Sequence, residues 1–202
     1  MTDRDINELR TTVLETLEKT LIKVAQACDV ESALSEISHT AWTTLGDPKA
    51  ADRVGALKSG EQQFSVSGYF MISQDNRENI LIAEHGFPEE QHRLRIPAGL
   101  GHPGWVTKHQ AALLLENTDD HANFKQILKT ARMGSAMYSP MIWDGHFLGQ
   151  LITASQARNT YGEPDHDLHR IFAHSATAVF IARGGSKFIS GLFSNDPVPS
   201  SI

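Results

Sequence analysis

The chain has 202 residues, carries a formal net charge of −6 at pH 7 and contains one cysteine, Cys28. Its composition, with 40% hydrophobic and 21% charged residues, is typical of a single globular domain with flanking segments, and no apolar run approaches the ~18 residues that a membrane-spanning helix needs. The acidic balance gives no attractive field for nucleic acid and the single cysteine excludes an internal disulfide, so we expect a cytoplasmic protein that binds neither nucleic acid nor a membrane.

Residues 1–29 are predicted to form an N-terminal amphipathic helix. No glycine or proline occurs between residues 3 and 29, and apolar residues from Leu14 to Cys28 recur at alternating intervals of three and four, which is the spacing of one helix face. Cys28 falls on this face and is expected to be a small buried hydrophobe. The face either packs on the chain's own domain or forms the seam of a dimer, and both interpretations stay open.

A second helix and an antiparallel group of strands follow. Asp29 is expected to cap a helix from Val30 to about Leu45, and the polar stretch 49–63 is interpreted as a loop. β-Branched and aromatic residues then predict three strands, the first two joined by a polar turn at 74–79; they are 64–73, 80–83 and 92–96.

Glycine and proline mark the middle of the chain. Three glycines and two prolines make residues 97–104 a predicted loop, which a short helix at 105–109 follows. Apolar residues in the polar stretch 117–132 are spaced for a second short helix. Both short helices are expected to lie over a neighbouring element as a cover.

The strongest hairpin signal is the dipeptide Asp144-Gly145. It joins two predicted strands, 135–143 and 147–154, and Pro140 indicates an edge or a bulge in the first of them. A last helix is predicted from 165 to 183, and the tail 184–202 is either flexible or docked on a neighbour. This order of helices and strands predicts an α+β fold.

Four short motifs, taken in their order along the chain, resemble those of the GAF domain family. They are Gly101-His102-Pro103-Gly104-Trp105-Val106, Leu114-Leu115-Glu116-Asn117, the run from Gly134 to Met141, and the run from Asp144 to Leu151. The resemblance covers roughly residues 30–183. It implies a central antiparallel sheet of about six strands, with N- and C-terminal helices on one face and a roof of short helices and loops, residues 97–132, over a ligand pocket on the other.

Several activities known in the family lack their residues in this chain. Free methionine-(R)-sulfoxide reductases use pocket cysteines, one of which would fall at Pro103, and a glutamate that would fall at Ala136. Covalent bilin attachment also needs a roof cysteine, and Asn159-Thr160 lacks the lysine of the cyclic-nucleotide motif. The resemblance therefore implies no catalytic residues and no identified cofactor.

The histidines do not predict a metal site. His166 and His169 are spaced i,i+3 on the last helix, but we expect them on a solvated face beside the apolar stripe, with no third ligand. His102, in the roof loop, is the histidine most expected to meet a ligand.

Strand alternation assigns side chains to the two faces of the predicted sheet. If Ala136, Tyr138 and Phe70 face the pocket, then Tyr69, Met71, Met137 and Met141 face the helices, although a bulge would invert this assignment. Trp105 is expected to act as an aromatic lid, with Phe124 as a second one. The predicted ligand-binding residues are therefore Phe70, His102, Trp105, Phe124, Ala136 and Tyr138.

The resemblance implies a non-catalytic sensor that binds an unidentified small molecule, forms a homodimer through its terminal helices and signals to a separate output protein. One alternative is a structural dimerisation module without a ligand. Another is a relative of the sulfoxide reductases that has lost its cysteines.

Overall fold

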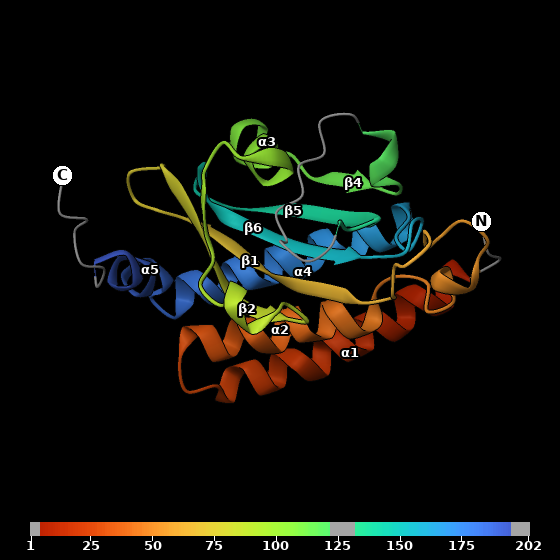
Figure 1. Ribbon diagram of the computed structural model, residues 1–202. Helices are drawn as coiled ribbons and strands as arrows, with labels where there is room; N and C mark the ends of the chain where they lie inside the picture. Colours follow the sequence, from red (N-terminus) through yellow and green to blue (C-terminus); the bar gives the residue numbers. More distant parts are fainter. Residues whose placement is uncertain (1–4, 122–131, 195–202) are drawn as a thin grey trace, which may run out of the picture.

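The computed structural model describes residues 5–121 and 132–194, which form a six-stranded antiparallel sheet between two unequal layers (Figure 1). The strand order is β3-β2-β1-β6-β5-β4. Helices α1, α2 and α4 lie on one side of the sheet, which we call the helix side, and α3 lies on the other, the roof side. The expected α+β architecture is confirmed.

The elements follow the predicted order. The helices are α1 (Ile6–Gln26), α2 (Val30–Thr44), α3 (Gly101–His109), α4 (Glu163–Ala182) and α5 (Gly185–Ser194), with short 3-10 turns η1 (Ala50–Asp52), η2 (Glu89–Gln91) and η3 (Thr118–Asp120). The strands are β1 (Ser65–Ile72), β2 (Glu78–His85), β3 (Arg95–Pro97), β4 (Leu113–Leu115), β5 (Ser135–Trp143) and β6 (His146–Ser155).

The helix side is built in two steps. α2 packs on β1 and β2 and α4 packs on β5, whereas α1 packs on α2 and α4 from outside. Asp29 caps α2 as predicted, accepting the backbone N–H of Ser32 at 2.7 Å. At the other end of the layer, the Arg183 guanidinium donates to the carbonyls of Val24 and Ala27 and so holds α4 against the end of α1.

The expectation that Cys28 is buried is wrong. α1 ends at Gln26, because Ala27 takes an extended conformation, and Asp29 must already turn outward to cap α2. Cys28 therefore lies in the short connection between the two helices, where its side chain is exposed.

The tail continues as a docked helix as far as Ser194. Phe188, Leu192 and Phe193 of α5 are partly buried against the helix-side core. The Arg95 guanidinium lies over the Phe193 ring, 4.7 Å from its centroid, and donates to the Leu192 carbonyl at 2.9 Å.

The segment predicted as the loop 97–104 instead contains the first turn of α3. Pro103 is the third residue of the helix, where its missing N–H costs nothing because first-turn N–H groups have no partner within the helix. Gly104 is needed for close packing, since a Cβ there would lie 2.2 Å from the carbonyl carbon of Gly99. Composition alone therefore misplaced the start of α3.

The hairpin is confirmed, with a left-handed conformation at both Asp144 and Gly145 that fits a type I′ turn. The register of β5 and β6 shifts between Met141 and Ile142, directly after Pro140. β4 pairs only with residues 136–138, so Pro140 lies beyond its end and no neighbouring strand needs its missing N–H.

Strand alternation divides the buried side chains into two clusters. Tyr69, Met71, Met137 and Met141 lie in the helix-side cluster, whereas Phe70, Ala136 and Tyr138 lie in the roof-side cluster. The predicted face of each of these residues is confirmed. The bulge after Pro140 does not invert them, because it lies beyond this part of the strand.

Substitution of Gly149 tests how tightly the centre of the sheet is packed. Gly149 has φ +154°, and an added Cβ would lie 2.5 Å from the Phe70 carbonyl oxygen. We expect Gly149→Ala to lower the free energy of unfolding by about 3 kcal/mol in urea titrations. Gly191→Ala in α5, where a Cβ meets nothing within 4 Å, is the control and should change stability little. Equal effects of the two substitutions would contradict this description of the sheet.

Candidate functional site

The roof side of the sheet is covered by α3, which is tied to the centre of the sheet. The Gln150 side-chain amide on β6 donates to the Pro103 carbonyl of α3 at 3.0 Å, and Val106 of α3 is fully buried. The buried apolar members of the cluster between them are Val66, Phe70, Leu81, Ile96, Val106, Leu115, Met133, Ala136, Tyr138, Ile152 and Ala154.

Three aromatic side chains from separate parts of the chain lie near one another beside this cluster. The His102 ring of α3 lies 6.4 Å from the Tyr138 ring of β5 and 6.0 Å from the His121 ring, which follows η3. Burial lowers the pKa of His102 below its ordinary value, and the neighbouring His121 lowers it further. Burial raises the pKa of the Tyr138 phenol. Both His102 and Tyr138 are therefore uncharged at neutral pH and act as hydrogen-bonding groups rather than as charges.

The structure brings together four of the six predicted ligand-binding residues. Phe70, Ala136 and Tyr138 are buried in the roof-side cluster, with His102 beside Tyr138. Trp105 is 39% exposed and packs on His109 with ring centroids 4.5 Å apart, so it lies outside the cluster. Phe124 lies outside the described residues. The ligand contacts of all six stay a prediction.

Two buried carboxamides on the roof side were missed by the sequence analysis. Asn79 and Gln150 are both 0% exposed, and neither polar atom of the Asn79 side chain has a hydrogen-bond partner, nor does Gln150 Oε1. Asn79 had been assigned to the turn 74–79, but it is the second residue of β2 and pairs with Ile96 of the roof-side cluster. Its place two residues before Leu81, on the same face, was the signal available in the sequence.

The prediction that His166 and His169 lie on a solvated face is wrong. His169 is completely buried on the helix side, with Nδ1 2.7 Å from Ser139 Oγ and Nε2 3.1 Å from Thr153 Oγ1. Both hydroxyls project from the sheet toward α4 and supply the partners that a buried imidazole needs. His166 is 8% exposed.

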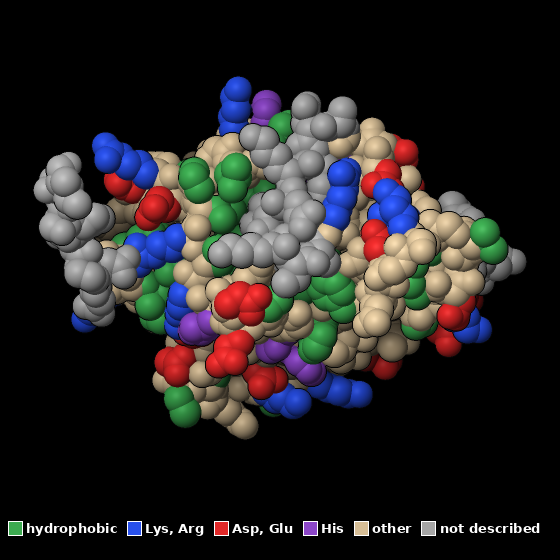
Figure 2. Space-filling view, viewed as in Figure 1, with side chains coloured by type: hydrophobic (Ala, Val, Ile, Leu, Met, Phe, Trp, Pro, Cys, Tyr) green, Lys and Arg blue, Asp and Glu red, His purple; other side chains and the backbone are tan. Residues whose placement is uncertain are grey.

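This network does not form a catalytic triad, because His169 is enclosed and its ring partners are two hydroxyls rather than a carboxylate. Across residues 5–121 and 132–194, no group of three or more His, Cys, Asp or Glu side chains is arranged to hold a metal ion. On the face seen in Figure 2, the acidic and basic side chains of the described segments are interspersed rather than gathered by sign. Among the described helices, none is long and apolar enough to cross a membrane.

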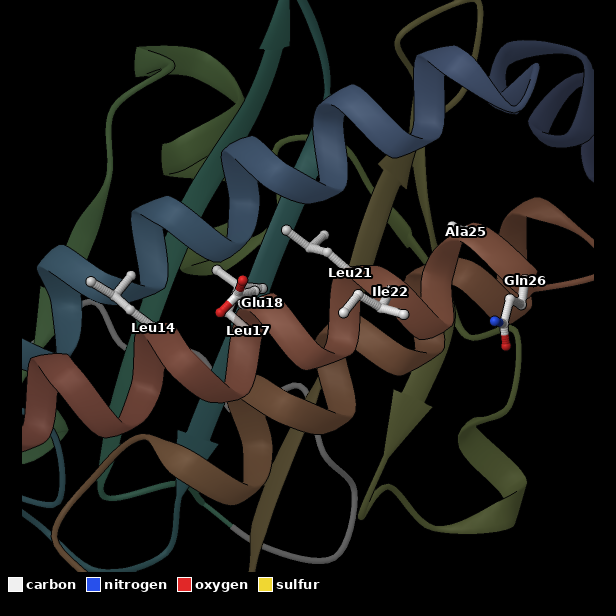
Figure 3. A pocket seen from close by; sticks show the side chains of 7 residues that line it. All are labelled: Leu14, Leu17, Glu18, Leu21, Ile22, Ala25 and Gln26. Carbon is white, nitrogen blue, oxygen red and sulfur yellow. The ribbon is translucent and has the colours of Figure 1, made fainter.

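A groove of about 620 Å³ runs along α1 on the side that faces α4. Leu14, Glu18 and Leu21 point into the space between α1 and α4 (Figure 3). Leu14 and Leu21 are exposed, and so is Ile22 on the same groove. The two helices run in the same direction, since Arg10 pairs with Asp167 near their starts and Arg183 reaches Val24 near their ends. The groove is therefore an apolar surface on the side of the protein opposite α3.

The buried His169 predicts that stability depends on pH. Burial lowers the pKa of His169 to about 3, so the unfolded chain binds a proton at this residue more readily than the folded protein does. The stabilisation is complete above the unfolded pKa, roughly 6.5, and is lost as the pH falls from there toward 3. When the pH is lowered from 7 to 5, the free energy of unfolding measured in urea titrations should fall in both proteins. We expect the fall to be about 2 kcal/mol smaller in His169→Gln than in the unsubstituted protein.

The matched control for this experiment is His146→Gln, because His146 is exposed in the hairpin. It should keep the pH dependence of the unsubstituted protein. The same pH dependence in His169→Gln would contradict the burial of a neutral imidazole.

Comparison with solved structures identifies the fold. The GAF domain of a phosphoenolpyruvate-protein phosphotransferase from Coxiella burnetii aligns with a TM-score of 0.70 and 20% identity, over 87% of this chain and 96% of that one. The corresponding domain from Acinetobacter aligns with a TM-score of 0.67 and 15% identity, over 88% of this chain and 98% of that one. The free methionine-R-sulfoxide reductase of Neisseria meningitidis, in complex with its substrate, aligns with a TM-score of 0.65 and 19% identity, over 86% of this chain and 91% of that one. No protein-family model and no curated protein sequence matches the chain. The protein has a GAF-domain fold, which the domains of the two phosphotransferases and the reductase share.

Proposed function

We propose that this protein is a non-catalytic GAF-type sensor that binds a small molecule on the roof side of its sheet. The proposal rests on one observation: Phe70, Ala136, Tyr138 and His102 converge beneath and beside α3 from separate elements. A site with apolar walls and a few polar groups is typical of small-molecule binding. A structural neighbour on the same fold, the Neisseria reductase, holds its substrate, which adds support by analogy.

The position of the cysteine supports a non-catalytic role. Thiol redox chemistry needs a thiolate within reach of the substrate. Cys28 lies between α1 and α2, on the opposite side of the sheet from α3 (Figure 1). On the roof side of the sheet, Pro103 of α3 and Ala136 of β5 occupy the positions where the resemblance to the reductases places a cysteine and a glutamate.

Native mass spectrometry of the purified protein tests ligand binding directly. We expect a bound small molecule that is released on unfolding and is recovered with unchanged mass after prolonged incubation, because the module does not transform it. His102→Ala should lose at least about 90% of the bound species, since the imidazole borders the site.

The control is His109→Ala, which removes an exposed histidine from the same helix and should retain the ligand. Two results together would contradict the proposal of a sensor: a protein mass equal to that of the chain alone, and no compound that stabilises the protein in a thermal-shift screen. The alternative, a dimerisation module without a ligand, would then be favoured.

The groove on α1 supports the second half of the proposal, a homodimer. Exposed apolar side chains in one groove lose their contact with water when a second copy covers them. Leu14, Leu21 and Ile22 provide such a surface, and α1 lies outside α2 and α4 on the helix side. A separate output protein that responds to this dimer stays a prediction.

Substitution in the groove tests the dimer. We expect Leu14→Asp combined with Ile22→Asp to convert a dimer into a monomer in sedimentation velocity, because two carboxylates would be buried in an apolar interface. Val54→Asp, at an exposed position in the loop after η1, should leave the dimer intact. A wild-type protein that is already monomeric at high micromolar concentration would rule this interface out.

A further inference from the structure

The two buried carboxamides on the roof side lie on the two strands that flank β1. Gln150 pairs with Phe70, and Asn79 pairs with Ile72, two residues further along the same strand. Phe70 and Ile72 share a face, and Phe70 belongs to the roof-side cluster. Asn79 and Gln150 therefore flank β1 on the roof side, one strand away in each direction.

Their hydrogen bonds are incomplete. Gln150 uses its N–H₂ group on the Pro103 carbonyl and leaves its oxygen without a partner, while Asn79 has a partner for neither its oxygen nor its nitrogen. Buried polar groups are almost always hydrogen-bonded, because an unmade bond loses the interaction with water and gains nothing. One donor and two acceptors thus stay unpaired on a single face of the sheet.

Among the described residues, no buried carboxylate or guanidinium group belongs to the cluster around these carboxamides. The buried side chains with ionisable acid or guanidinium groups in the described residues are Arg158 and Asp165. Arg158 is paired with Glu61 and Asp119, and Asp165 accepts N–H groups from Gly46 and Gly162. Neither belongs to the roof-side cluster. A charged ligand group placed between Asn79 and Gln150 would lose its hydration without meeting a counter-charge.

We infer that the roof side binds an uncharged molecule with an amide edge, a carboxamide or a lactam ring, which Asn79 and Gln150 recognise. Such an edge presents an N–H donor next to a C=O acceptor. The donor meets the free oxygen of Gln150 or Asn79, and the acceptor meets the Asn79 N–H₂ group. Phe70, between the two carboxamides, provides an apolar surface for the body of the molecule. This inference rests on the proposed function and narrows it to one class of ligand.

Nicotinamide and nicotinate form a matched pair of probes, because they differ in a carboxamide against a carboxylate on the same ring. Titration of the full chain with each, followed by ¹H–¹⁵N NMR, is expected to shift the side-chain amide signals of Asn79 and Gln150 with nicotinamide. Nicotinate should bind at least about tenfold more weakly. Uracil, whose ring carries two amide edges, should behave like nicotinamide.

Asn79→Leu distinguishes recognition from a structural role. Leucine is branched at Cγ like asparagine and has no polar side-chain atoms, so the variant should melt about 3 °C or more above the unsubstituted protein and lose the response to nicotinamide. The control is Ser139→Ala on the helix side, which removes a hydroxyl that is already bonded to His169. It should melt lower and bind nicotinamide normally.

The outcomes separate this inference from the proposed function. Nicotinate binding as tightly as nicotinamide, or Asn79→Leu retaining the response, overturns the amide class and leaves the sensor intact. If neither amide probe binds while native mass spectrometry finds a ligand without an amide group, the class is again wrong. If neither probe binds and no ligand copurifies, buried water molecules bonded to the two carboxamides explain their unpaired atoms better than a ligand does. Both proposals are then wrong.

Discussion

The central strands of this sheet pack against a different layer on each of their two faces, and the rest of the structure depends on that constraint. β1 is buried along almost its whole length, so each successive side chain is committed to the helix side or to the roof side. Gly149 fixes the relation between β1 and β6, because only a glycine fits against the Phe70 carbonyl. A slip of one residue would move Tyr69 into the roof and Phe70 into the helical layer. The register of one pair of strands therefore determines what each layer contains.

The two layers differ in how well they satisfy their polar groups. On the helix side, His169, Ser139 and Thr153 bond to one another, so a polar cluster is enclosed without unpaired atoms on the imidazole. On the roof side, Asn79 and Gln150 leave three polar atoms unpaired. On the helix side His166 Nε2 is also buried without a partner, but the roof side has three such atoms on the two strands that flank β1, which is consistent with a binding layer. This contrast, rather than the GAF fold alone, is what favours a ligand on the roof side.

Local patterns in the sequence were enough to predict most of the architecture. The cap at Asp29, the turn at Asp144-Gly145 and the assignment of Phe70 and Tyr138 to one face each depend on neighbouring residues, and these predictions are confirmed. His169 could not be placed in the same way, because its partners lie on strands that precede it by 30 and 16 residues. Helical spacing placed His169 beside the apolar stripe, but it did not show the hydroxyls that allow the imidazole to be buried.

The remaining errors have the same origin. Glycine and proline between 97 and 104 indicate a loop by composition, yet the packing of Gly104 on Gly99 makes them the start of α3. Asn79 is polar and follows a turn, so its alternation with Leu81 was the one local sign of a strand and did not show that it would be buried. In the candidate site, the apolar lining was predictable from alternation. The buried carboxamides were not, because their burial depends on β1, β3 and α3 closing around them.

A crystal structure of the protein as purified tests the central claim most directly, at a resolution that shows ordered water. The account predicts non-protein density on the roof side of β1, within hydrogen-bond distance of Asn79 and Gln150 and shaped like a planar group larger than water. It would be contradicted by carboxamides that bond to protein atoms or to single waters alone, with apolar side chains filling the space beneath α3.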